Sequence, residues 1–201
     1  MLITFEGIDG CGKSTQIEKL KDYFDNTGIN YSVFREPGGT EISERIRSLL
    51  LHDTDEMDAV TELLLFSAAR SQLIREKVIP LLEQNEIVIL DRFYDSTTAY
   101  QGFGRNSSSL SDIYTLNKLA SHGTVPDLTF YLKIDPQTAD QRTKGSEKDR
   151  LESAGHDFFK KVATGYDMLA STDKRFRVID AGRSPEEVHD EILTIIGAYQ
   201  Q

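Results

Sequence analysis

The chain carries Gly7-Ile8-Asp9-Gly10-Cys11-Gly12-Lys13-Ser14 near its start, which fits the pattern G-x-x-x-x-G-K-[ST]. A strand candidate over residues 2–6, with Leu2, Ile3 and Phe5 as apolar members, precedes it, and helical spacing of apolar residues begins after Lys13. A strand, a glycine-rich turn and a helix in this order direct backbone N–H groups and a helix N-terminus at one point. The sequence therefore predicts a phosphate-binding loop (P-loop). The residues expected to contact ATP are Gly7, Ile8, Asp9, Gly10, Cys11, Gly12, Lys13, Ser14 and Thr15.

Two side chains of this loop and one more distant carboxylate are expected to handle phosphates and Mg²⁺. Lys13 is expected to reach the β- and γ-phosphates as a catalytic group, and Ser14 is expected to hold Mg²⁺. The apolar run over residues 87–90 ends at Asp91, which resembles the strand whose terminal carboxylate assists the metal in P-loop proteins. Cys11 occupies a free position of the pattern. We interpret it as a small residue that fits there rather than as a reactive thiol.

Short apolar runs alternate with helical patterns along the chain, which is typical of βαβ units. Strands are expected at residues 2–6, 31–34, 87–90, 128–132 and 176–179. They predict an α/β P-loop NTPase fold of three layers, in which helices flank a five-stranded parallel sheet. No linker interrupts the pattern, so residues 1–201 are expected to form a single domain.

Apolar residues at helical spacing predict the connecting helices. A second helix is expected from the helical spacing of Ile42, Ile46, Leu49 and Leu50. A longer helical pattern over about residues 58–84 contains Pro80, which is expected to kink or end it locally. Ser184-Pro185-Glu186-Glu187 is expected to open the last helix, with serine as N-cap and glutamate three residues later.

Composition excludes several classes of partner. The 201 residues include 23 basic and 33 acidic side chains, a net charge of −10 that argues against a nucleic-acid duplex as the main partner. No apolar run approaches the roughly 18 residues of a membrane span, so no membrane partner is expected. The N-terminal residues do not resemble a signal peptide, and a single cysteine allows no internal disulfide. We expect a cytoplasmic protein.

The main rival among P-loop proteins is a GTPase. That class commonly carries an Asn-Lys-x-Asp motif that reads guanine. Asn117-Lys118-Leu119-Ala120 begins in the same way, but Ala120 supplies no carboxylate. The segment also lies inside an apolar-periodic helical pattern, so we interpret it as helix surface.

Several blocks, in order and spacing, resemble the thymidylate kinase family over nearly the whole chain. They are Phe5-Glu6-Gly7, Arg35-Glu36-Pro37-Gly38-Gly39-Thr40, Leu65-Phe66-Ser67-Ala68-Ala69-Arg70, Asp91-Arg92-Phe93-Tyr94-Asp95-Ser96-Thr97-Thr98-Ala99-Tyr100-Gln101-Gly102 and Pro126-Asp127-Leu128-Thr129. The resemblance implies a homodimer and the reaction ATP + dTMP → ADP + dTDP with Mg²⁺, a step toward dTTP.

The resemblance also implies the dTMP-binding residues. Phe66 is expected to stack on thymine and Arg70, four residues later, to donate to a thymine carbonyl. By pattern alone Phe66 would be a core residue and Arg70 a surface residue. Thr97 and Gln101 are expected to read the base, Tyr100 to lie against the 2′ side of the sugar, and Asp9 to lie near the 3′-hydroxyl and Mg²⁺. The residues expected around the acceptor phosphate are Arg35, Glu36, Pro37, Arg47 and Arg92.

The charged stretch at about residues 141–152 resembles the mobile lid of the family. Some members carry a catalytic arginine in the P-loop and others carry it in the lid. Gly10 and Cys11 leave this P-loop without one, so the resemblance places it in the lid. Arg142 and Arg150 are the candidates, with Arg142 slightly favoured, and Arg92 is the third arginine expected to act in catalysis. Asp180-Ala181-Gly182-Arg183 is a weaker candidate for the adenine border.

Two other functions stay open at this point. One is a kinase for another nucleoside monophosphate or for a deoxynucleoside, in which Glu6 would act as a base on a sugar hydroxyl. The other is a nucleotide-dependent switch without transfer activity. The clamp arginines argue against a deoxynucleoside, and the lid arginines argue against a switch.

Overall fold

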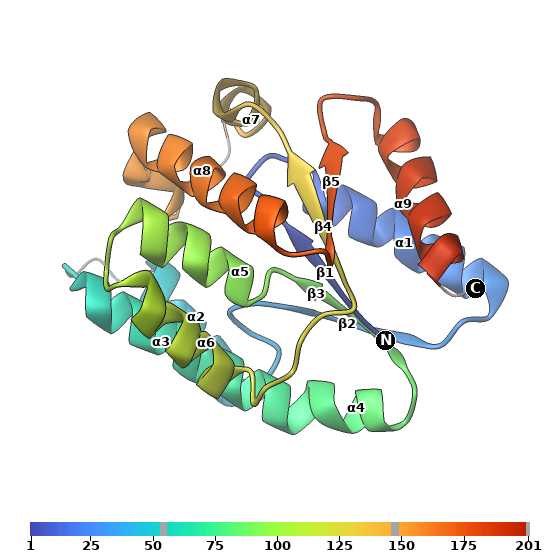
Figure 1. The fold of residues 1–201 in the computed structure, drawn as a ribbon, viewed down its shortest axis with the longest axis horizontal. Coiled ribbons are helices and arrows are strands. Elements are labelled where there is room, and N and C mark those ends of the chain that lie inside the picture. Colours follow the sequence, from blue (N-terminus) through green and yellow to red (C-terminus); the bar gives the residue numbers. More distant parts are fainter. Residues whose placement is uncertain (53–55, 146–148, 200–201) are drawn as a thin grey trace.

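In the computed structural model, which describes residues 1–52, 56–145 and 149–199, five parallel strands form one sheet in the order β2-β3-β1-β4-β5 (Figure 1). The strands are β1 (Leu2–Glu6), β2 (Tyr31–Arg35), β3 (Ile87–Asp91), β4 (Leu128–Lys133) and β5 (Phe176–Asp180). All five strands expected from the sequence are therefore confirmed. Helices cover both faces of the sheet, and the predicted three-layer α/β fold is confirmed.

Helices α1 (Lys13–Thr27) and α9 (Pro185–Tyr199) pack against each other on one face of the sheet. Ile3 and Phe5 of β1 point to this face, where they join Leu20 and Phe24 of α1 in the main core. The predicted start of α9 is confirmed, because the Ser184 hydroxyl accepts from the Glu187 N–H and the Glu187 carboxylate accepts from the Ser184 N–H. This reciprocal pair satisfies backbone donors that would otherwise lack partners.

The other face is covered by a larger set of helices. They are α3 (Ala59–Leu73), the π-helical η1 (Ile74–Val78), α4 (Ile79–Glu83), α5 (Tyr94–Thr97), the π-helical η2 (Thr98–Gly104) and α8 (His156–Thr172). Of these, α3, α5 and η2 also line the site. Figure 1 shows α2 (Glu41–His52) and α6 (Leu110–Ala120) beside α3, farther from the sheet. Two short helices, α7 (Pro136–Arg142) and the 3₁₀ helix η3 (Glu152–Ala154), lie before α8.

The long helical pattern is confirmed as a helical run, but this run does not end at Pro80. A helical run extends from Ala59 to Glu83, and its hydrogen bonding changes to the π pattern over Ile74–Val78. Pro80 has no N–H to donate, and its ring would clash with the carbonyl four residues earlier in a regular helix. The run continues past the proline because the widened turn directly before it accommodates the ring.

The second helix expected from the sequence is confirmed as α2, and its apolar residues are only partly buried. Leu50 is fully buried and Ile46 packs beside it, but Ile42 is 50% exposed and Leu49 is 47% exposed. The reason is that α2 packs on α3, not directly on the sheet. Only one edge of its apolar surface is therefore covered within this chain.

A buried polar layer lies between the sheet and α5, where the sequence indicated only an apolar core. The hydroxyls of Thr4 and Thr129 are 2.8 Å apart, and Thr129 also accepts from Arg175. Arg175 holds Asp95 with two bonds of 2.6 Å. A guanidinium that donates twice to one carboxylate compensates the desolvation of both charges.

The segment expected as a lid is only partly helical. Arg142 is the last residue of α7, residues 143–145 form a turn, and residues 149–151 lead into η3. Residues 146–148 of this segment, with Lys148, lie outside the described residues. The lid therefore stays a prediction. Among the described residues, no helix is long and apolar enough to cross a membrane.

The Arg175–Asp95 pair allows a test of the buried polar layer. We expect Arg175→Ala to lower the free energy of unfolding by about 3 kcal/mol, because it leaves a buried carboxylate without its cation. Urea unfolding followed by circular dichroism measures this change. Arg45→Ala is the control, because Arg45 makes an exposed pair with Glu41 and should leave the midpoint nearly unchanged. Equal effects of the two variants would contradict the role given to the buried layer.

Candidate active site

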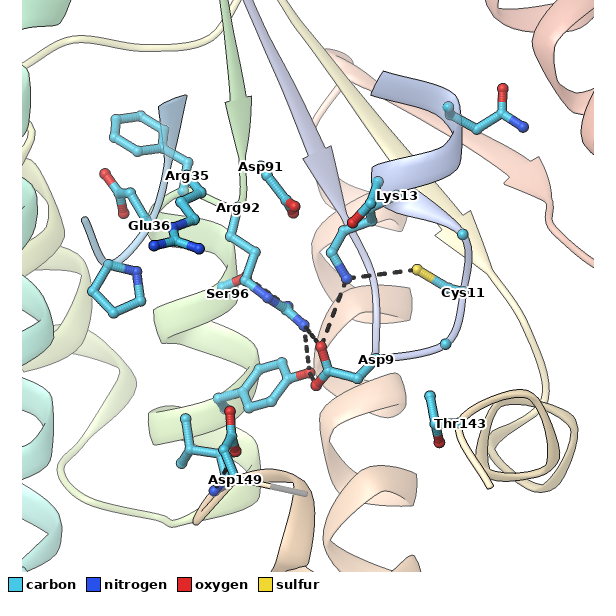
Figure 2. Close-up of a pocket in the computed structure, with 18 of the residues that line it drawn as sticks. Asp9, Cys11, Lys13, Arg35, Glu36, Asp91, Arg92, Ser96, Thr143 and Asp149 are labelled. Carbon is cyan, nitrogen blue, oxygen red and sulfur yellow. Dashed lines mark hydrogen bonds and ion pairs between the residues drawn. The ribbon is translucent and has the colours of Figure 1, made fainter. Parts of the chain in front are cut away.

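A cavity of about 790 Å³ opens at the carboxyl ends of β1, β2 and β3. Ligands of open α/β sheets bind at this edge, where the loops after the strands converge. P-loop residues line one side of the cavity, and residues of β2, α3, α5 and η2 line the other. Figure 2 shows Lys13 and Asp9 on one side of it, Arg35 and Glu36 on the other, and Arg92 between them in contact with Asp9. The residues predicted for donor and acceptor therefore meet in one cavity.

Glycines of the P-loop are required by the backbone and by its neighbours. Gly7, Gly10 and Gly12 have φ values of 137°, 80° and 98°, which favour glycine. A Cβ atom at Gly7 would lie 2.7 Å from the Leu132 carbonyl oxygen, and one at Gly10 would lie 2.5 Å from the Ala139 carbonyl oxygen. The loop is thus fitted between β4 and α7, and this packing fixes the curve of its backbone.

Lys13 lies at the start of α1 with its side chain buried in the loop. Its Nζ donates to the carbonyls of Gly7 at 3.1 Å and Ile8 at 3.3 Å, and lies 3.9 Å from Asp9 Oδ1. These contacts point the ammonium group into the concave side of the loop. A cation and a helix N-terminus at one point form an anion-binding site. Ser14 and Thr15 follow on the exposed rim of the cavity.

Cys11 behaves as the small, buried residue that the sequence favoured. Its side chain is buried in the core between the loop and β4. Burial raises the pKa of the Cys11 thiol, although Lys13 and Arg92 act in the opposite direction. A raised pKa disfavours the thiolate, which is the reactive form of cysteine.

Arg92 occupies the centre of the cavity. It has a φ of 71°, an uncommon value for a residue other than glycine. One terminal nitrogen donates to the Gly7 carbonyl at 2.9 Å, and the other donates to Asp9 at 2.5 Å and to the Tyr100 hydroxyl at 3.1 Å. The guanidinium also lies over the Tyr100 ring, 4.9 Å from its centre. Arg92 therefore connects the P-loop to the residues of η2.

Asp9 is ionised at any ordinary pH. Burial acts to raise the pKa of its carboxyl, but the charges of Arg92 and Lys13 outweigh burial and lower that pKa to about 2. Tyr100 adds a hydrogen bond of 3.1 Å to the other oxygen. The carboxylate thus balances the two cations that face the cavity.

The predicted base-reading residues converge on the far side of the cavity. Arg70 is 1% exposed, so the pattern-based assignment of Arg70 to the surface is wrong. Its Nε donates to Glu36 at 2.7 Å and one terminal nitrogen donates to Thr97 at 2.9 Å. Phe66 lines the same side and is half-buried, which fits a ring with one face toward the cavity better than a core residue.

The other two arginines expected as a phosphate clamp, Arg35 and Arg47, also line this cavity. Arg35 lies at the end of β2 and donates to Glu44 at 3.3 Å. Arg47 comes from α2 and donates to the Pro37 carbonyl at 2.9 Å, beside a cis Glu36–Pro37 bond. Together with Arg92 they bring three guanidinium groups to one cavity.

The two lid candidates lie in different surroundings. Arg142 lines the cavity beside Thr143 and the P-loop. Arg150 instead makes a 2.6 Å ion pair with Glu62 and donates to the Leu50 carbonyl at 2.9 Å. The geometry brings Arg142, and not Arg150, to the donor side.

Three residues that matter for the site were missed or misassigned from the sequence. Asn117 was assigned to helix surface, but its side chain is buried. Its amide oxygen accepts from Arg70 at 3.5 Å, and its amide nitrogen donates to the Thr98 hydroxyl at 3.0 Å. Glu6 was considered only as a base. Glu62 was not singled out, although a lone acid among apolar helix positions was visible.

Glu6 is buried and does not line the cavity. It accepts from the Phe93 N–H at 2.7 Å, the Ser96 hydroxyl at 2.6 Å and the Tyr166 hydroxyl at 3.0 Å. Ser96 and Tyr166 in turn accept from Arg92. Glu6 therefore supports the loop that carries Arg92 from beneath. Burial, together with the charge of Asp95, raises its pKa to about 7.

Comparisons with known proteins agree with this geometry. The family model described as thymidylate kinase matches residues 5–192. The thymidylate kinase of Chlorobium phaeobacteroides is 46% identical, over 96% of this chain and 93% of the relative. The thymidylate kinase of Fervidobacterium nodosum is 44% identical, over 99% of this chain and all of the relative. A crystal structure of thymidylate kinase from Ehrlichia chaffeensis superposes with a TM-score of 0.81 at 35% identity and 98% coverage of both chains.

The raised pKa of Glu6 predicts how stability depends on pH. Between about pH 4.5 and pH 7, the folded protein keeps a proton on Glu6 that the unfolded chain releases, so the free energy of unfolding falls as the pH rises. Glu6→Gln removes this titrating proton. We expect the free energy of unfolding of the variant to fall less steeply with pH, by up to about 1.4 kcal/mol per pH unit.

Urea unfolding of both proteins at several pH values between 5 and 8 measures the two slopes. Burial also raises the pKa of Glu36 to about 7, but that contribution is common to both proteins. Parallel curves for the wild type and Glu6→Gln would contradict a buried Glu6 that titrates near neutral pH.

Proposed function

The chain belongs to the thymidylate kinase family, and from this premise we propose that it transfers the γ-phosphoryl group of ATP to dTMP, with Mg²⁺, in the cavity around Arg92. One observation carries the proposal: a single cavity holds a P-loop on one side, a base-reading cluster on the other and Arg92 between them. Phosphoryl transfer needs both substrates aligned in line, and one cavity with two such ends provides this.

The donor side suits the triphosphate of ATP. The backbone of the P-loop, Lys13 and the N-terminus of α1 supply donors and positive charge for the β- and γ-phosphates. Ala181, Arg183, Pro185 and Val188 line the cavity beyond the loop, and we assign this side to the adenine. The weaker expectation for residues 180–183 thus stays a proposal.

The residues near Lys13 fit Mg²⁺. Asp91 Oδ1 is buried and accepts no hydrogen bond from the described residues, and the Ser14 hydroxyl faces the same cavity. Among the described residues no cluster of three metal-ligating side chains occurs, which suits an ion held mainly by phosphate oxygens and water. Ser14, Asp91 and Asp9 would hold the ion or its water, and it would neutralise charge on the phosphates.

The acceptor side suits a pyrimidine deoxynucleotide. Phe66 offers a ring face for stacking, and Arg70 and Gln101 offer polar groups to the edge of the base. Tyr100 and Asp9 lie between the base and the P-loop, where the sugar would lie. Arg35, Arg47 and Arg92 would hold the acceptor phosphate, because planar guanidinium groups match phosphate oxygens. The acceptor is already a phosphate oxyanion, so the transfer needs no general base.

The other functions are less well supported. A deoxynucleoside kinase would need a base at the sugar hydroxyl, and Glu6 is buried beneath Phe93 and Ser96, outside the cavity. A nucleotide switch needs no base-reading cluster for a second nucleotide. The acceptor side of the cavity therefore favours transfer to a nucleoside monophosphate.

We also assign the remaining properties from this family membership. The chain forms a single cytoplasmic domain whose lid spans about residues 141–152. It also forms a homodimer, and exposed apolar side chains on the adjacent helices α2 and α3 are candidates for the interface: Ile42, Leu49, Val60 and Leu64. A sedimentation mass of one chain at micromolar concentration would overturn the dimer.

The acceptor is tested by coupled ADP release with a panel of dTMP, dUMP, dCMP, dAMP, dGMP and thymidine. We expect dTMP to give the highest kcat/KM, because it alone combines an imide edge that pairs with Arg70 and Gln101, a methyl group that fills the cavity beside Phe66 and a phosphate for the arginines. Thymidine should give almost none, since it lacks the phosphate that the arginines bind. If dTMP does not stimulate ADP release, the proposed function is wrong.

Substitutions of the two lid candidates, Arg142 and Arg150, should affect different kinetic constants. We expect Arg142→Ala to lower kcat for dTMP by about 10²–10³-fold, because a cation beside the P-loop stabilises the transferring phosphoryl group. Arg150→Ala should leave kcat within a few-fold and should raise the KM for dTMP, because Arg150 is paired with Glu62. Steady-state kinetics at saturating ATP distinguishes the variants, and a larger kcat loss for Arg150→Ala would reverse the assignment.

A further inference from the structure

Gln101, one of the residues expected to recognise the base, is oriented by a side chain that does not itself line the cavity. Its side chain is 2% exposed and lines the acceptor side. Its amide nitrogen donates to Glu62 Oε1 at 2.8 Å. Glu62 lies in the first turn of α3, is 1% exposed and does not line the cavity. Glu62 therefore contacts Gln101, the residue expected to recognise the base, without itself contacting a ligand.

A carboxylate at this place permits only one orientation of the Gln101 amide. Ionised carboxylate oxygens accept hydrogen bonds and cannot donate them. The NH₂ group of Gln101 must therefore face Glu62, because the reverse orientation would bring two acceptor oxygens together. The amide oxygen is then the group that Gln101 offers to a ligand, and it can only accept.

Two arginines form ion pairs with Glu62. Arg150 approaches Glu62 Oε2 at 2.6 Å, and Arg105 approaches Oε1 at 3.5 Å. A buried carboxylate without a cation would be strongly destabilised, and these two guanidinium groups compensate it. These contacts between α3, η2 and residue 150 hold the Glu62 carboxylate in place, and the carboxylate in turn fixes the orientation of Gln101.

Arg70 supplies the complementary half of the pattern. Its guanidinium donates and cannot accept, and it lines the same side of the cavity as Gln101. The pair offers one donor and one acceptor to the edge of a base. Thymine and uracil present a carbonyl oxygen next to an N–H on this edge, which matches. Cytosine presents an amino group next to a bare ring nitrogen, which is the reverse pattern.

We propose that Glu62 is a specificity-determining positioning residue, which orients the Gln101 amide so that the cavity accepts an imide base and rejects cytosine. This inference rests on the proposed function, because it takes the base of the acceptor to lie between Phe66 and Gln101. A site that demands a specific hydrogen bond discriminates strongly against a base that lacks it, since its own buried groups are left unpaired.

Glu62→Gln tests the proposal with almost no change in shape. An amide at position 62 both donates and accepts, so Gln101 can turn over and offer either group. We expect the ratio of kcat/KM for dTMP to that for dCMP to fall at least about 10-fold, mainly through KM, while the KM for ATP is unchanged. A merely structural role would lower both activities equally and leave the ratio as it was, which would overturn the proposal.

Two further variants test whether Glu62 acts through Gln101 and through its carboxylate. In a Gln101→Ala background, Glu62→Gln should have no further effect on the ratio, because the group that it orients is gone. A ratio that falls there as far as it does in the wild type would overturn the proposal. Glu62→Asp keeps an acceptor-only carboxylate and should keep the ratio high even if dTMP binds less tightly.

The Glu62→Asp variant also covers a failure of Glu62→Gln to fold, because loss of discrimination in Glu62→Asp would by itself overturn the proposal. Glu76→Gln is the matched control, since Glu76 is a partly exposed glutamate in the same helical run and lies outside the cavity. Absence of dTMP turnover in the wild type would instead overturn the proposed function. Wild-type turnover of dTMP with an unchanged ratio in Glu62→Gln would overturn only the inference on Glu62.

Discussion

The ion pair between Arg92 and Asp9 links the two halves of the site. A guanidinium that is buried among protein atoms needs acceptors on several sides, and Arg92 finds them in the P-loop, in α5 and in η2. Despite burial, the charge of Asp9 raises the pKa of Arg92 still further above its usual range. A permanent positive charge is therefore held where the donor side and the acceptor side meet.

The strand order makes this interaction possible. Because β3 lies next to β1, the P-loop and the segment after Asp91 leave the sheet side by side. The strained backbone of Arg92 is supported from below, where Glu6 accepts from the Phe93 N–H. Beneath it, the buried layer of Thr4, Thr129 and the Asp95–Arg175 pair fixes α5 on the sheet. The buried polar groups beneath the site thus help to fix the position of the Arg92 side chain.

Much of this could be predicted from the sequence. The five strands and the capped start of α9 follow from local patterns, and the glycines of the P-loop follow from the backbone that a phosphate cradle requires. The roles of Phe66 and Arg70 did not follow from pattern, because apolar residues lie nearly all round their helix α3 and give no direction to its buried face. Those of Thr97 and Gln101 did not follow either, because helical spacing puts the two residues on one face without showing what that face contacts. Resemblance to a family, and not periodicity, placed them at the cavity.

The buried acids could not be placed from the sequence for a different reason. Glu6, Glu62 and Asp95 are all buried, and their stabilising partners come from distant segments: residue 166 for Glu6, residue 150 for Glu62 and residue 175 for Asp95. The same holds for Asn117, whose partners lie on α3 and η2. Only tertiary packing decides whether such a side chain is solvated or paired.

The central claim is that Arg92 lies between two bound phosphates in one cavity. A crystal structure of the protein with dTMP, a non-hydrolysable ATP analogue and Mg²⁺ tests it most directly. We expect the dTMP phosphate within hydrogen-bonding distance of Arg92, the thymine edge at Arg70 and Gln101, and the analogue's phosphates inside the P-loop. A dTMP phosphate bound away from Arg92, or a thymine bound beside residues 181–188, would contradict the account.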